Sequence, residues 1–367
     1  MSLAETAPPG RARRGLRHLF ASPRFHSLVS AVPGLRRLAR RDGEALFDLV
    51  AGFVHSQVLM AVVELGVLHR LMDGPAASEE LGHPNIPPDR LTDFLEAAAA
   101  LGLVRRRADG LWVIARQGAA LLGVPGLEAM IRHHAILYRD MAEPTALLRG
   151  DDTELSSFWP YVFGAGAAKD PATARRYSDL MADSQALVAE ETLRRVDLSG
   201  ASEILDIGGG TGAFLTAVGH RHAGSRLHLF DLPAVLPEAE ARFAAANLTD
   251  RVTITPGSFR DDSLPTSADI ITLIRVLYDH QDDTVLSLLT AIHRALPPSG
   301  RIVVSEPMKG HKATDTYFTF YCMAMQSGRA RHPRQIASLL EKAGFSSVKD
   351  HGTTRPFITH VLSARRN

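Results

Sequence analysis

Asp206 and the glycines that follow it form the segment of this chain best suited to holding a nucleotide-type ligand. Residues 203–212 read Glu-Ile-Leu-Asp-Ile-Gly-Gly-Gly-Thr-Gly, so a short apolar run ends in a carboxylate and a glycine-rich turn follows. Glycine tolerates a positive φ and lets a ligand lie against bare main chain. A helix that begins at Ala213 would present unpaired N–H groups to an anionic group. The pattern predicts a cofactor site at the edge of a parallel sheet.

The spacing of these glycines alone does not identify the cofactor. Gly208-x-Gly210-x-x-Ala213 also satisfies the fingerprint of nicotinamide and flavin sites. The carboxylate of Asp206 can pair with the α-ammonium of a methionine moiety, but it would repel a pyrophosphate. Asp231 ends the next expected strand and suits a ribose diol with any of these cofactors. The position of Asp206 therefore favours S-adenosylmethionine, held by Asp206, Gly208, Gly210, Gly212 and Asp231.

The composition is that of an ordinary protein with room for two domains, since the chain has 367 residues of which 45% are hydrophobic. Cys322 is the single cysteine, which excludes a disulfide framework, and no metal site is expected. We find no apolar run of the roughly 18 residues needed to span a bilayer and no secretory signal, and so expect a cytoplasmic protein. The net charge of +1 argues against a nucleic-acid-binding surface.

The first 42 residues are a basic arm. Between Arg11 and Arg41 there are nine arginines and no acidic residue, with apolar residues such as Phe20, Phe25 and Leu28 among them. An amphipathic basic segment of this kind can rest on the anionic surface of the inner membrane as a peripheral contact. The alternative is a solvated helical arm that packs on its own subunit or on a partner subunit.

Residues 43–122 are predicted to form a winged-helix-like domain. Helical patterns cover 45–73, 77–81 and 88–103, with Pro88 at a helix start. Residues 103–114 follow as a hairpin with an Asp109-Gly110 turn. A winged helix can bind DNA, but we see no broad basic recognition helix, and dimerisation or a role as a substrate lid is favoured. Residues 123–195 read as a helical bridge and substrate lid.

The pattern changes to alternating strands and helices in residues 196–367, the predicted cofactor-binding domain. Strands are expected near 203–207, 226–231, 251–255, 268–274, 301–305 and 357–362. Helices are expected near 213–222, 234–246, 282–296 and 333–343. This alternation predicts an α/β fold with a doubly wound, Rossmann-like sheet.

Several motifs resemble the class I S-adenosylmethionine-dependent O-methyltransferases of the caffeate and acetylserotonin type. The carriers are the 205–212 and 230–233 segments, Gly257-Ser258-Phe259, Arg275-Val-Leu-Tyr-Asp-His280 and the 300–307 segment. Residues 21–25, 45–54 and 317–325, with the Arg275–His280 run, look most like the carotenoid O-methyltransferases of the hydroxyneurosporene and demethylspheroidene type. The resemblance implies a homodimer with a winged-helix dimerisation domain. It also implies a product S-adenosylhomocysteine and methylation of the tertiary C-1 hydroxyl of an acyclic carotenoid.

The resemblance also implies cofactor contacts from Leu232, Ser258, Phe259 and Arg275. The family usually has an acid at the position of Ser258, so the contact to the adenine amino group is open. Phe259 can still pack on the ring.

The catalytic segment departs further from the family. The plant-type motif is His-Asp-Trp, and the matching residues here are Tyr278-Asp279-His280. The histidine that deprotonates a phenol is therefore replaced, a second family acid falls near Ala330, and Glu306 remains in place of the first. We expect Arg275, Tyr278 and Asp279 to position the substrate and His280 to accept the proton. The alternatives for His280 are a structural contact, a supporting residue or a surface group.

The aromatic and methionine-rich stretch 317–325 suits a long apolar ligand. We expect a substrate pocket that includes His134, Tyr138, Tyr321 and Met325; the alternative is a dimer core or ordinary helix packing. The sequence thus predicts an O-methyltransferase for an apolar hydroxylated substrate, most simply a carotenoid. The alternatives are an enzyme for a phenolic quinone, polyketide or tetrapyrrole, and a cofactor-binding protein without catalysis.

Overall fold

The computed structural model describes residues 18–158 and 184–367. The chain divides into two compact units, Met1–Gly118 and Ala119–Asn367. The boundary falls inside helix α6 (Arg116–Leu122), which also contains the predicted domain end at residue 122.

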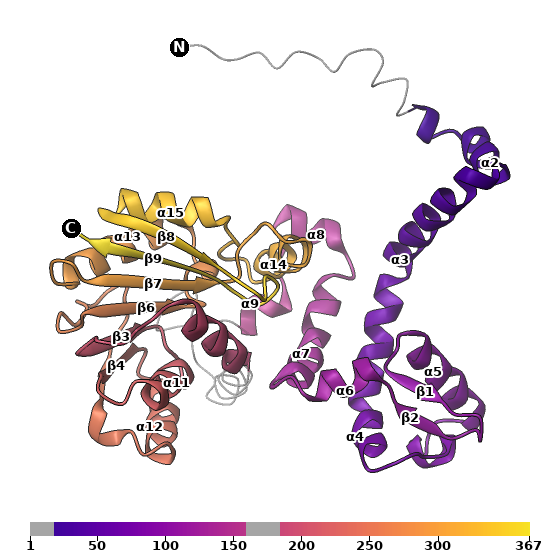
Figure 1. Ribbon diagram of the computed structural model, residues 1–367, viewed down its shortest axis with the longest axis horizontal. Coiled ribbons are helices and arrows are strands. Elements are labelled where there is room, and N and C mark those ends of the chain that lie inside the picture. Colours follow the sequence, from indigo (N-terminus) through magenta and orange to yellow (C-terminus); the bar gives the residue numbers. More distant parts are fainter. Residues whose placement is uncertain (1–17, 159–183) are drawn as a thin grey trace. The chain divides into compact units, whose positions relative to one another are not determined.

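The first unit is helical and ends in a short hairpin (Figure 1). Its elements are α2 (Pro23–Ala31), α3 (Pro33–Glu64), α4 (Val67–Met72), the 3-10 helix η1 (Ser78–Leu81), α5 (Pro88–Ala100) and the antiparallel strands β1 (Val104–Arg106) and β2 (Trp112–Ile114). Trp112 is buried, and its Nε1 donates to Ser78 Oγ at 2.9 Å, which ties the hairpin to η1. This order of helices and hairpin confirms the predicted winged-helix arrangement.

Helix α3 corrects one sequence-based expectation. Its 32 residues include an 18-residue window of mean hydropathy 1.8, of which 17% is buried, so its length and composition would allow it to cross a membrane. It is the single such helix in the part of the chain that the structure describes. The expectation that no segment meets this criterion was wrong because scattered polar residues hide the apolar stretch from a search for an unbroken run. The helix also continues through residue 42, where the basic arm was predicted to end.

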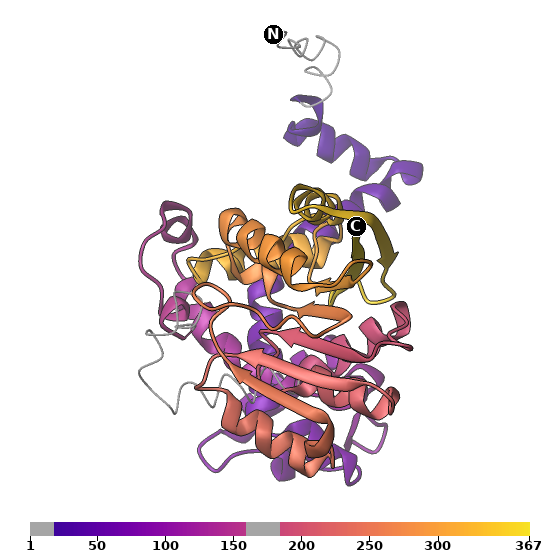
Figure 2. The same ribbon diagram turned by 90° about the vertical axis from the view of Figure 1, so that its left-hand side faces the viewer.

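The second unit is built on a seven-stranded sheet, and Figures 1 and 2 show its strands lying side by side. The strand order is β5-β4-β3-β6-β7-β9-β8. Five strands run parallel: β3 (Glu203–Ile207), β4 (Arg226–Asp231), β5 (Val252–Pro256), β6 (Ile270–Ile274) and β7 (Arg301–Glu306). The strands β8 (Phe345–Gly352) and β9 (His360–Arg366) are antiparallel. From β3 the chain builds the sheet outward to β4 and β5, and it then returns to the other side of β3 with β6 and β7. Ligands bind at such a switch point in the strand order.

Helices cover both faces of this sheet. On one face, α13 (Asp282–Ala295) and α15 (Pro333–Lys342) pack on Leu205, Ile271 and Leu273. On the other, α11 (Ala213–Arg221), α12 (Leu236–Ala245) and residues 188–198 pack on Ile204 and Leu229. The 3-10 helices η3 (Thr249–Arg251) and η4 (Leu277–Asp279) lie in the connections. Fully buried strands explain the continuous apolar runs in the sequence and confirm the doubly wound sheet.

Helices α7 (Leu127–Asp140), α8 (Pro144–Arg149), α9 (Glu154–Phe158) and α14 (Lys312–Ala324), with helical residues 184–195, complete the second unit. The predicted last strand over 357–362 is displaced, because β9 begins at His360. Phe357 and Ile358 lie in the preceding loop and line a pocket. Strand β8 was not predicted from the sequence, because its residues are mostly polar and show only a weak alternation with apolar ones. Its pairing with β9 is also interrupted by register shifts.

Candidate active site

The glycine loop after β3 has the conformation that its sequence predicts. Gly208, Gly210 and Gly212 have φ values of 70°, 58° and 72°, which few other residues adopt readily. A Cβ at Gly210 would meet no atom within 4 Å, so the main chain there is open to a ligand. A Cβ at Gly212 would strike the ring of Phe243, so this glycine also allows α11 to pack closely on α12.

Asp206 carries an oxygen that lacks a partner. Its side chain is fully buried, Oδ1 accepts from Thr272 Oγ1 at 2.5 Å, and Oδ2 is buried with no hydrogen-bond partner. Burial, with a smaller contribution from the charge of Asp231, raises the pKa of Asp206 to about 7. A buried unpaired carboxylate oxygen is costly unless a ligand satisfies it. The residue therefore fits the α-ammonium of a methionine moiety.

Asp231 lies at the end of β4, next to the same loop. Its Oδ2 accepts from the Gly210 N–H and its Oδ1 from the Leu232 N–H, both at 2.6 Å. Burial raises the pKa of Asp231 to about 6 in spite of these two bonds. Each oxygen has a further lone pair, so the carboxylate is oriented by the main chain and can still accept from ribose hydroxyls.

Ser258 is turned into its own loop. Its hydroxyl donates to Asp261 at 3.0 Å and accepts from the Arg260 N–H at 3.2 Å, while its own N–H donates to Asp262 at 2.8 Å. The hydroxyl that was predicted to contact the cofactor is therefore already hydrogen-bonded within its own loop. Phe259, beside it, is partly buried and packs on the core of the second unit.

The loop after β6 is held from behind by a buried carboxylate. Glu306 is 1% exposed and accepts from the N–H groups of Val276 at 2.9 Å, Leu277 at 2.7 Å and Tyr278 at 3.4 Å. Burial raises the pKa of Glu306 to about 7, against the effect of these bonds. Glu306, which remains in place of the first family acid, thus orients the main chain of the loop.

Arg331 braces the other end of the same loop. Its guanidinium is buried and donates to the carbonyl oxygens of Leu277 at 2.8 Å and His280 at 2.7 Å, and to Asp282 at 2.8 Å. Arg275, directly before the residues that Glu306 and Arg331 hold, has a positive φ of 59°. Such strain in a non-glycine residue is held by its surroundings and is frequent at functional sites.

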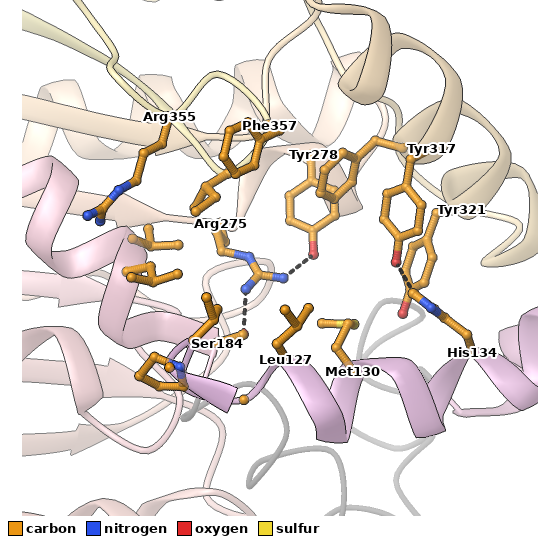
Figure 3. A pocket seen from close by; sticks show the side chains of 18 residues that line it. Leu127, Met130, His134, Ser184, Arg275, Tyr278, Tyr317, Tyr321, Arg355 and Phe357 are labelled. Carbon is orange, nitrogen blue, oxygen red and sulfur yellow. Dashed lines mark hydrogen bonds between the residues drawn. The ribbon is translucent and has the colours of Figure 1, made fainter. Parts of the chain in front are cut away.

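A pocket of about 550 Å³ opens beside this loop within the second unit (Figure 3). Most of its lining is apolar. The lining residues are Gly123, Val124, Pro125, Gly126, Leu127, Met130, His134, Ser184, Leu187, Val188, Arg275, Tyr278, Tyr317, Phe318, Tyr321, Arg355, Phe357 and Ile358.

Arg275 and Tyr278 form a polar group at the pocket wall (Figure 3). Arg275 donates from Nη1 to Ser184 Oγ at 2.7 Å and from Nη2 to Tyr278 Oη at 3.5 Å, and its Cζ lies 6.0 Å from the centre of the Tyr278 ring. Burial raises the pKa of Tyr278 far above its ordinary value, and the nearby Asp279 raises it further. Tyr278 is therefore a neutral hydrogen-bond donor and not an ionised base.

Two histidines of α7 pair with two tyrosines of α14. His134 Nε2 lies 2.8 Å from Tyr317 Oη, and His133 Nε2 lies 2.9 Å from Tyr321 Oη. Burial lowers the pKa of both histidines, that of His133 to about 4, so both are neutral. The hydrogen bond between His134 and Tyr317 engages one polar atom of each side chain, and their rings add aromatic surface to this side of the pocket.

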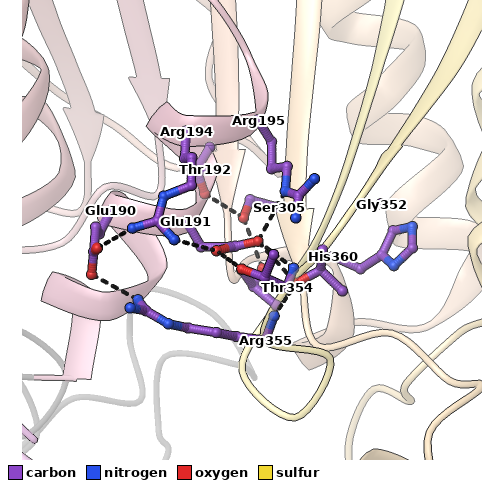
Figure 4. A network of polar contacts seen from close by, with 12 residues as sticks. Glu190, Glu191, Thr192, Arg194, Arg195, Ser305, Gly352, Thr354, Arg355 and His360 are labelled. Atoms are coloured by element: carbon purple, nitrogen blue, oxygen red, sulfur yellow. Dashed lines mark hydrogen bonds and ion pairs between the residues drawn. The ribbon is translucent and has the colours of Figure 1, made fainter.

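The loop between β8 and β9 is tied to helical residues 184–195 (Figure 4). Glu191 is fully buried and accepts from the N–H and Oγ1 of Thr354 at 2.6 and 2.7 Å and from Arg195 at 3.0 Å. Burial would raise the pKa of Glu191, but these hydrogen bonds outweigh it and lower the pKa to about 2. Arg355, which lines the pocket, donates to Glu190 at 2.7 Å.

His280 is not among the residues that line the pocket. Its Nδ1 lies 3.1 Å from Arg260 Nη2, and its ring packs edge-on to Phe259 with centroids 5.3 Å apart. Arg260 can only donate, so Nδ1 uses its lone pair and the proton of the neutral ring is on Nε2. Burial and the charges of Arg260 and Arg331 lower the pKa of His280 to about 4. These contacts favour a supporting role for His280, one of the alternatives above, and its role as proton acceptor stays a prediction.

The remaining predicted residues divide into two groups. His134 and Tyr321 line the pocket as expected, whereas Met325 is fully buried among the helices α7, α8 and α14. Tyr138 packs against His134 and is not among the residues that line the pocket. Asp279 is buried with an unpartnered Oδ1 and lies outside the pocket.

Met130, Ser184, Arg355 and Phe357 also line the pocket and were not predicted from the sequence. Their part in the pocket depends on contacts between distant segments, and no local pattern marks them.

A scan of protein families matches residues 138–346 to the O-methyltransferase domain. Two curated relatives are named demethylspheroidene O-methyltransferase. The protein of Cereibacter sphaeroides is 50% identical, and the match covers 98% of this chain and 97% of that protein. The protein of Rhodobacter capsulatus is 51% identical, and the match covers 99% of this chain and 92% of that protein. The solved structure of human N-acetylserotonin methyltransferase in complex with S-adenosylmethionine has a TM-score of 0.76 and 24% identity, covering 89% of this chain and 98% of that one.

Proposed function

Because the chain belongs to the S-adenosylmethionine-dependent O-methyltransferase family, we propose that it methylates the tertiary C-1 hydroxyl of an acyclic carotenoid of the hydroxyneurosporene or demethylspheroidene type. The observation that carries this proposal is the identity of about half of all residues, along nearly the whole chain, with two demethylspheroidene O-methyltransferases. The pocket supports it, since its wall is apolar and aromatic and its polar pair Arg275 and Tyr278 suits one hydroxyl.

The cofactor lies at the carboxyl edge of the sheet in this proposal. Bound S-adenosylmethionine supplies a methyl group activated on a sulfonium, and its transfer leaves S-adenosylhomocysteine. Asp206 would provide the unpaired oxygen for the ammonium, Asp231 would accept from the ribose hydroxyls, and the open main chain at Gly210 would let the ligand approach.

The residues of the β6 loop hold the acceptor oxygen in line. Tyr278 accepts a hydrogen bond from Arg275 and can donate its own proton to the substrate oxygen. Glu306 and Arg331 fix the main chain on which both side chains stand. Alignment of reacting atoms is worth several powers of ten in rate. In this proposal the buried polar groups of Glu306 and Arg331 contribute to catalysis by keeping that alignment.

The proton of the hydroxyl leaves during or after methyl transfer. A tertiary alcohol is too weak an acid for a neutral imidazole to ionise beforehand, and the protonated ether that forms gives its proton readily to water. The replacement of the family histidine by Tyr278 fits this chemistry, because a tertiary alcohol does not need the base that deprotonates a phenol before methyl transfer.

We also propose that the chain forms a homodimer through α3. The large apolar side chains Leu46, Phe47, Leu49, Val50 and Phe53 of this helix are 64–70% exposed, and clusters of exposed apolar residues mark interaction sites. A second copy would cover them. Equilibrium sedimentation should give a dimer for the native chain and a monomer for Phe47→Lys/Phe53→Lys; a native monomer would overturn this proposal.

We further propose that the chain is cytoplasmic and touches the inner membrane peripherally. In the described part of the basic arm, Arg24, Arg36, Arg37, Arg40 and Arg41 are exposed, and Arg40 pairs with Glu44. Binding to anionic vesicles should be weak and salt-sensitive. Removal of residues 1–41 should abolish co-sedimentation while turnover of a detergent-dispersed substrate persists; unchanged co-sedimentation would contradict the proposal.

The proposed function is tested by turnover of methyl-labelled cofactor with two acceptor panels, acyclic 1-hydroxycarotenoids in detergent and phenolic acceptors in buffer. We expect label in the carotenoid methyl ether and none in the phenols. Transfer to a phenol alone would favour a quinone, polyketide or tetrapyrrole substrate, and cofactor binding without any transfer would indicate a non-catalytic binding protein.

A further inference from the structure

We propose that His280, held by Arg260, is the polar contact by which this chain recognises the adenine ring of its cofactor. The inference rests on the use of S-adenosylmethionine and not on the identity of the acceptor. It can therefore be tested by binding alone.

The first argument is the place of His280 relative to the ribose site. The Gly257 N–H donates to the carbonyl oxygen of Asp231 at 2.9 Å, so the loop after β5 begins directly beside the residue that accepts from the ribose. A base attached to that ribose would lie near this loop. Phe259 stands in the loop, and the ring of His280 reaches it from the loop after β6, 74° from its plane.

The second argument is that the loop after β5 does not present the hydroxyl of Ser258. That hydroxyl is already engaged with Asp261 and with the Arg260 N–H. Phe259 gives apolar contact without hydrogen bonding. A neighbouring segment can supply a polar contact to the ring, and His280 packs on Phe259 from such a segment.

The third argument is the state of the imidazole. Arg260 donates to Nδ1, so the neutral ring carries its proton on Nε2. Nε2 makes no hydrogen bond with any described residue and is not among their buried, unpartnered polar atoms. It is therefore an accessible N–H donor, of the kind that pairs with the ring nitrogens of adenine, which are acceptors.

Arg260 acts through His280 as a positioning residue. Besides Nδ1 of His280 it contacts Thr284 Oγ1 at 3.4 Å, in the first turn of α13, so its guanidinium spans two segments. A positive charge beside the imidazole also keeps the ring from taking a second proton, which preserves the single-donor state.

The test is calorimetric binding of S-adenosylhomocysteine and its 1-deaza, 3-deaza and 7-deaza analogues, each of which lacks one acceptor nitrogen. For the native chain we expect one analogue to bind about 5- to 10-fold more weakly than S-adenosylhomocysteine, the size of one hydrogen bond. In His280→Phe, which keeps the ring packing, that analogue and S-adenosylhomocysteine should bind equally. His280→Gln keeps an N–H donor and should restore part of the discrimination.

Arg260→Met should reduce the discrimination, whereas the exposed controls His220→Phe on α11 and Arg294→Met on α13 should leave it intact. The inference is overturned if the native chain binds all three analogues as tightly as S-adenosylhomocysteine, or if His280→Phe still discriminates. Should His280→Phe not fold, the native panel and His280→Gln decide. If the native chain does not bind S-adenosylhomocysteine at all, the assignment of S-adenosylmethionine as the cofactor is contradicted instead.

Discussion

The loops after β3 and β6 meet at the same edge of the sheet, but different forces shape them. The β3 loop takes its form from its own residues, three glycines with positive φ and a carboxylate at each neighbouring strand end. The β6 loop takes its form from distant residues: Glu306 and Arg331 hold its main chain, and Arg260 holds the ring of His280. The β3 loop therefore keeps the glycine motif of the family. The β6 loop beside it carries Tyr278 where the plant-type motif has a histidine.

This difference predicts that variants of the two loops act on different constants. Variants of the β3 and β4 carboxylates should weaken cofactor binding, and variants of the β6 loop should lower kcat with cofactor affinity nearly unchanged.

The largest effect is expected for Arg275→Met. Removal of the guanidinium frees Tyr278 and leaves Ser184 without this donor, so the acceptor oxygen is no longer held in line. Misplacement of this order costs about 100-fold in kcat, measured with saturating cofactor. The exposed Arg294→Met is the matched control. A normal kcat for Arg275→Met would remove Arg275 from the site.

Asp231→Ala should weaken S-adenosylhomocysteine binding by about 10- to 100-fold, because hydrogen bonds to a charged group are worth about 1.5–3 kcal/mol. It also leaves the N–H groups of Gly210 and Leu232 without their acceptor. Calorimetry measures the change, with the exposed Asp250→Ala as control. NADH should not bind to the native chain, and detection of NADH binding without S-adenosylhomocysteine binding would contradict the cofactor.

Cofactor affinity should depend on pH through the two raised carboxyl pKa values, about 7 for Asp206 and about 6 for Asp231. The ligand needs the ionised forms, so affinity is highest above pH 7 and falls as pH falls, by about tenfold per unit for each protonated group. The cofactor-free protein shows the opposite trend: its folded state binds more protons than the unfolded chain, so these groups make it less stable as pH rises from about 4 to 7. Asp206→Asn should flatten the upper part of both curves; a flat native affinity curve from pH 5 to 8 would contradict the assignment.

The smallest effect is expected for Tyr278→Phe, which removes one neutral hydrogen bond and keeps the ring against Phe318. We expect a decrease of about 3- to 10-fold in kcat. Complete loss of activity in a folded, cofactor-binding variant would show that the proton leaves through this tyrosine.

Much of the fold could be predicted because its signals are local. The buried strands β3, β4 and β6 appear as apolar runs, and the glycines before α11 mark the turn. The positions of Asp206 and Asp231 beside the glycine loop could be predicted for the same reason, since each stands near the end of such a run.

The acceptor side could be predicted only in part. His280 follows Tyr278 closely in sequence, but Arg260 and Phe259 draw its ring toward the β5 loop, away from the pocket. Met325 shares a helical segment with Tyr321, yet the packing of α7, α8 and α14 buries it. Such contacts join segments far apart in the chain, and no spacing in one sequence encodes them.

The central claim is that this O-methyltransferase aligns a tertiary hydroxyl with its cofactor and needs no titrating histidine. The most direct measurement is kcat for an acyclic 1-hydroxycarotenoid at saturating S-adenosylmethionine from pH 6 to 9, for the native chain and His280→Phe. We predict that kcat is nearly independent of pH and equal in both proteins within about threefold, since general-base catalysis would be worth about 10²–10⁴. A native kcat that falls tenfold per unit below an apparent pKa between 6 and 8, and that His280→Phe lowers by 100-fold or more, would contradict it.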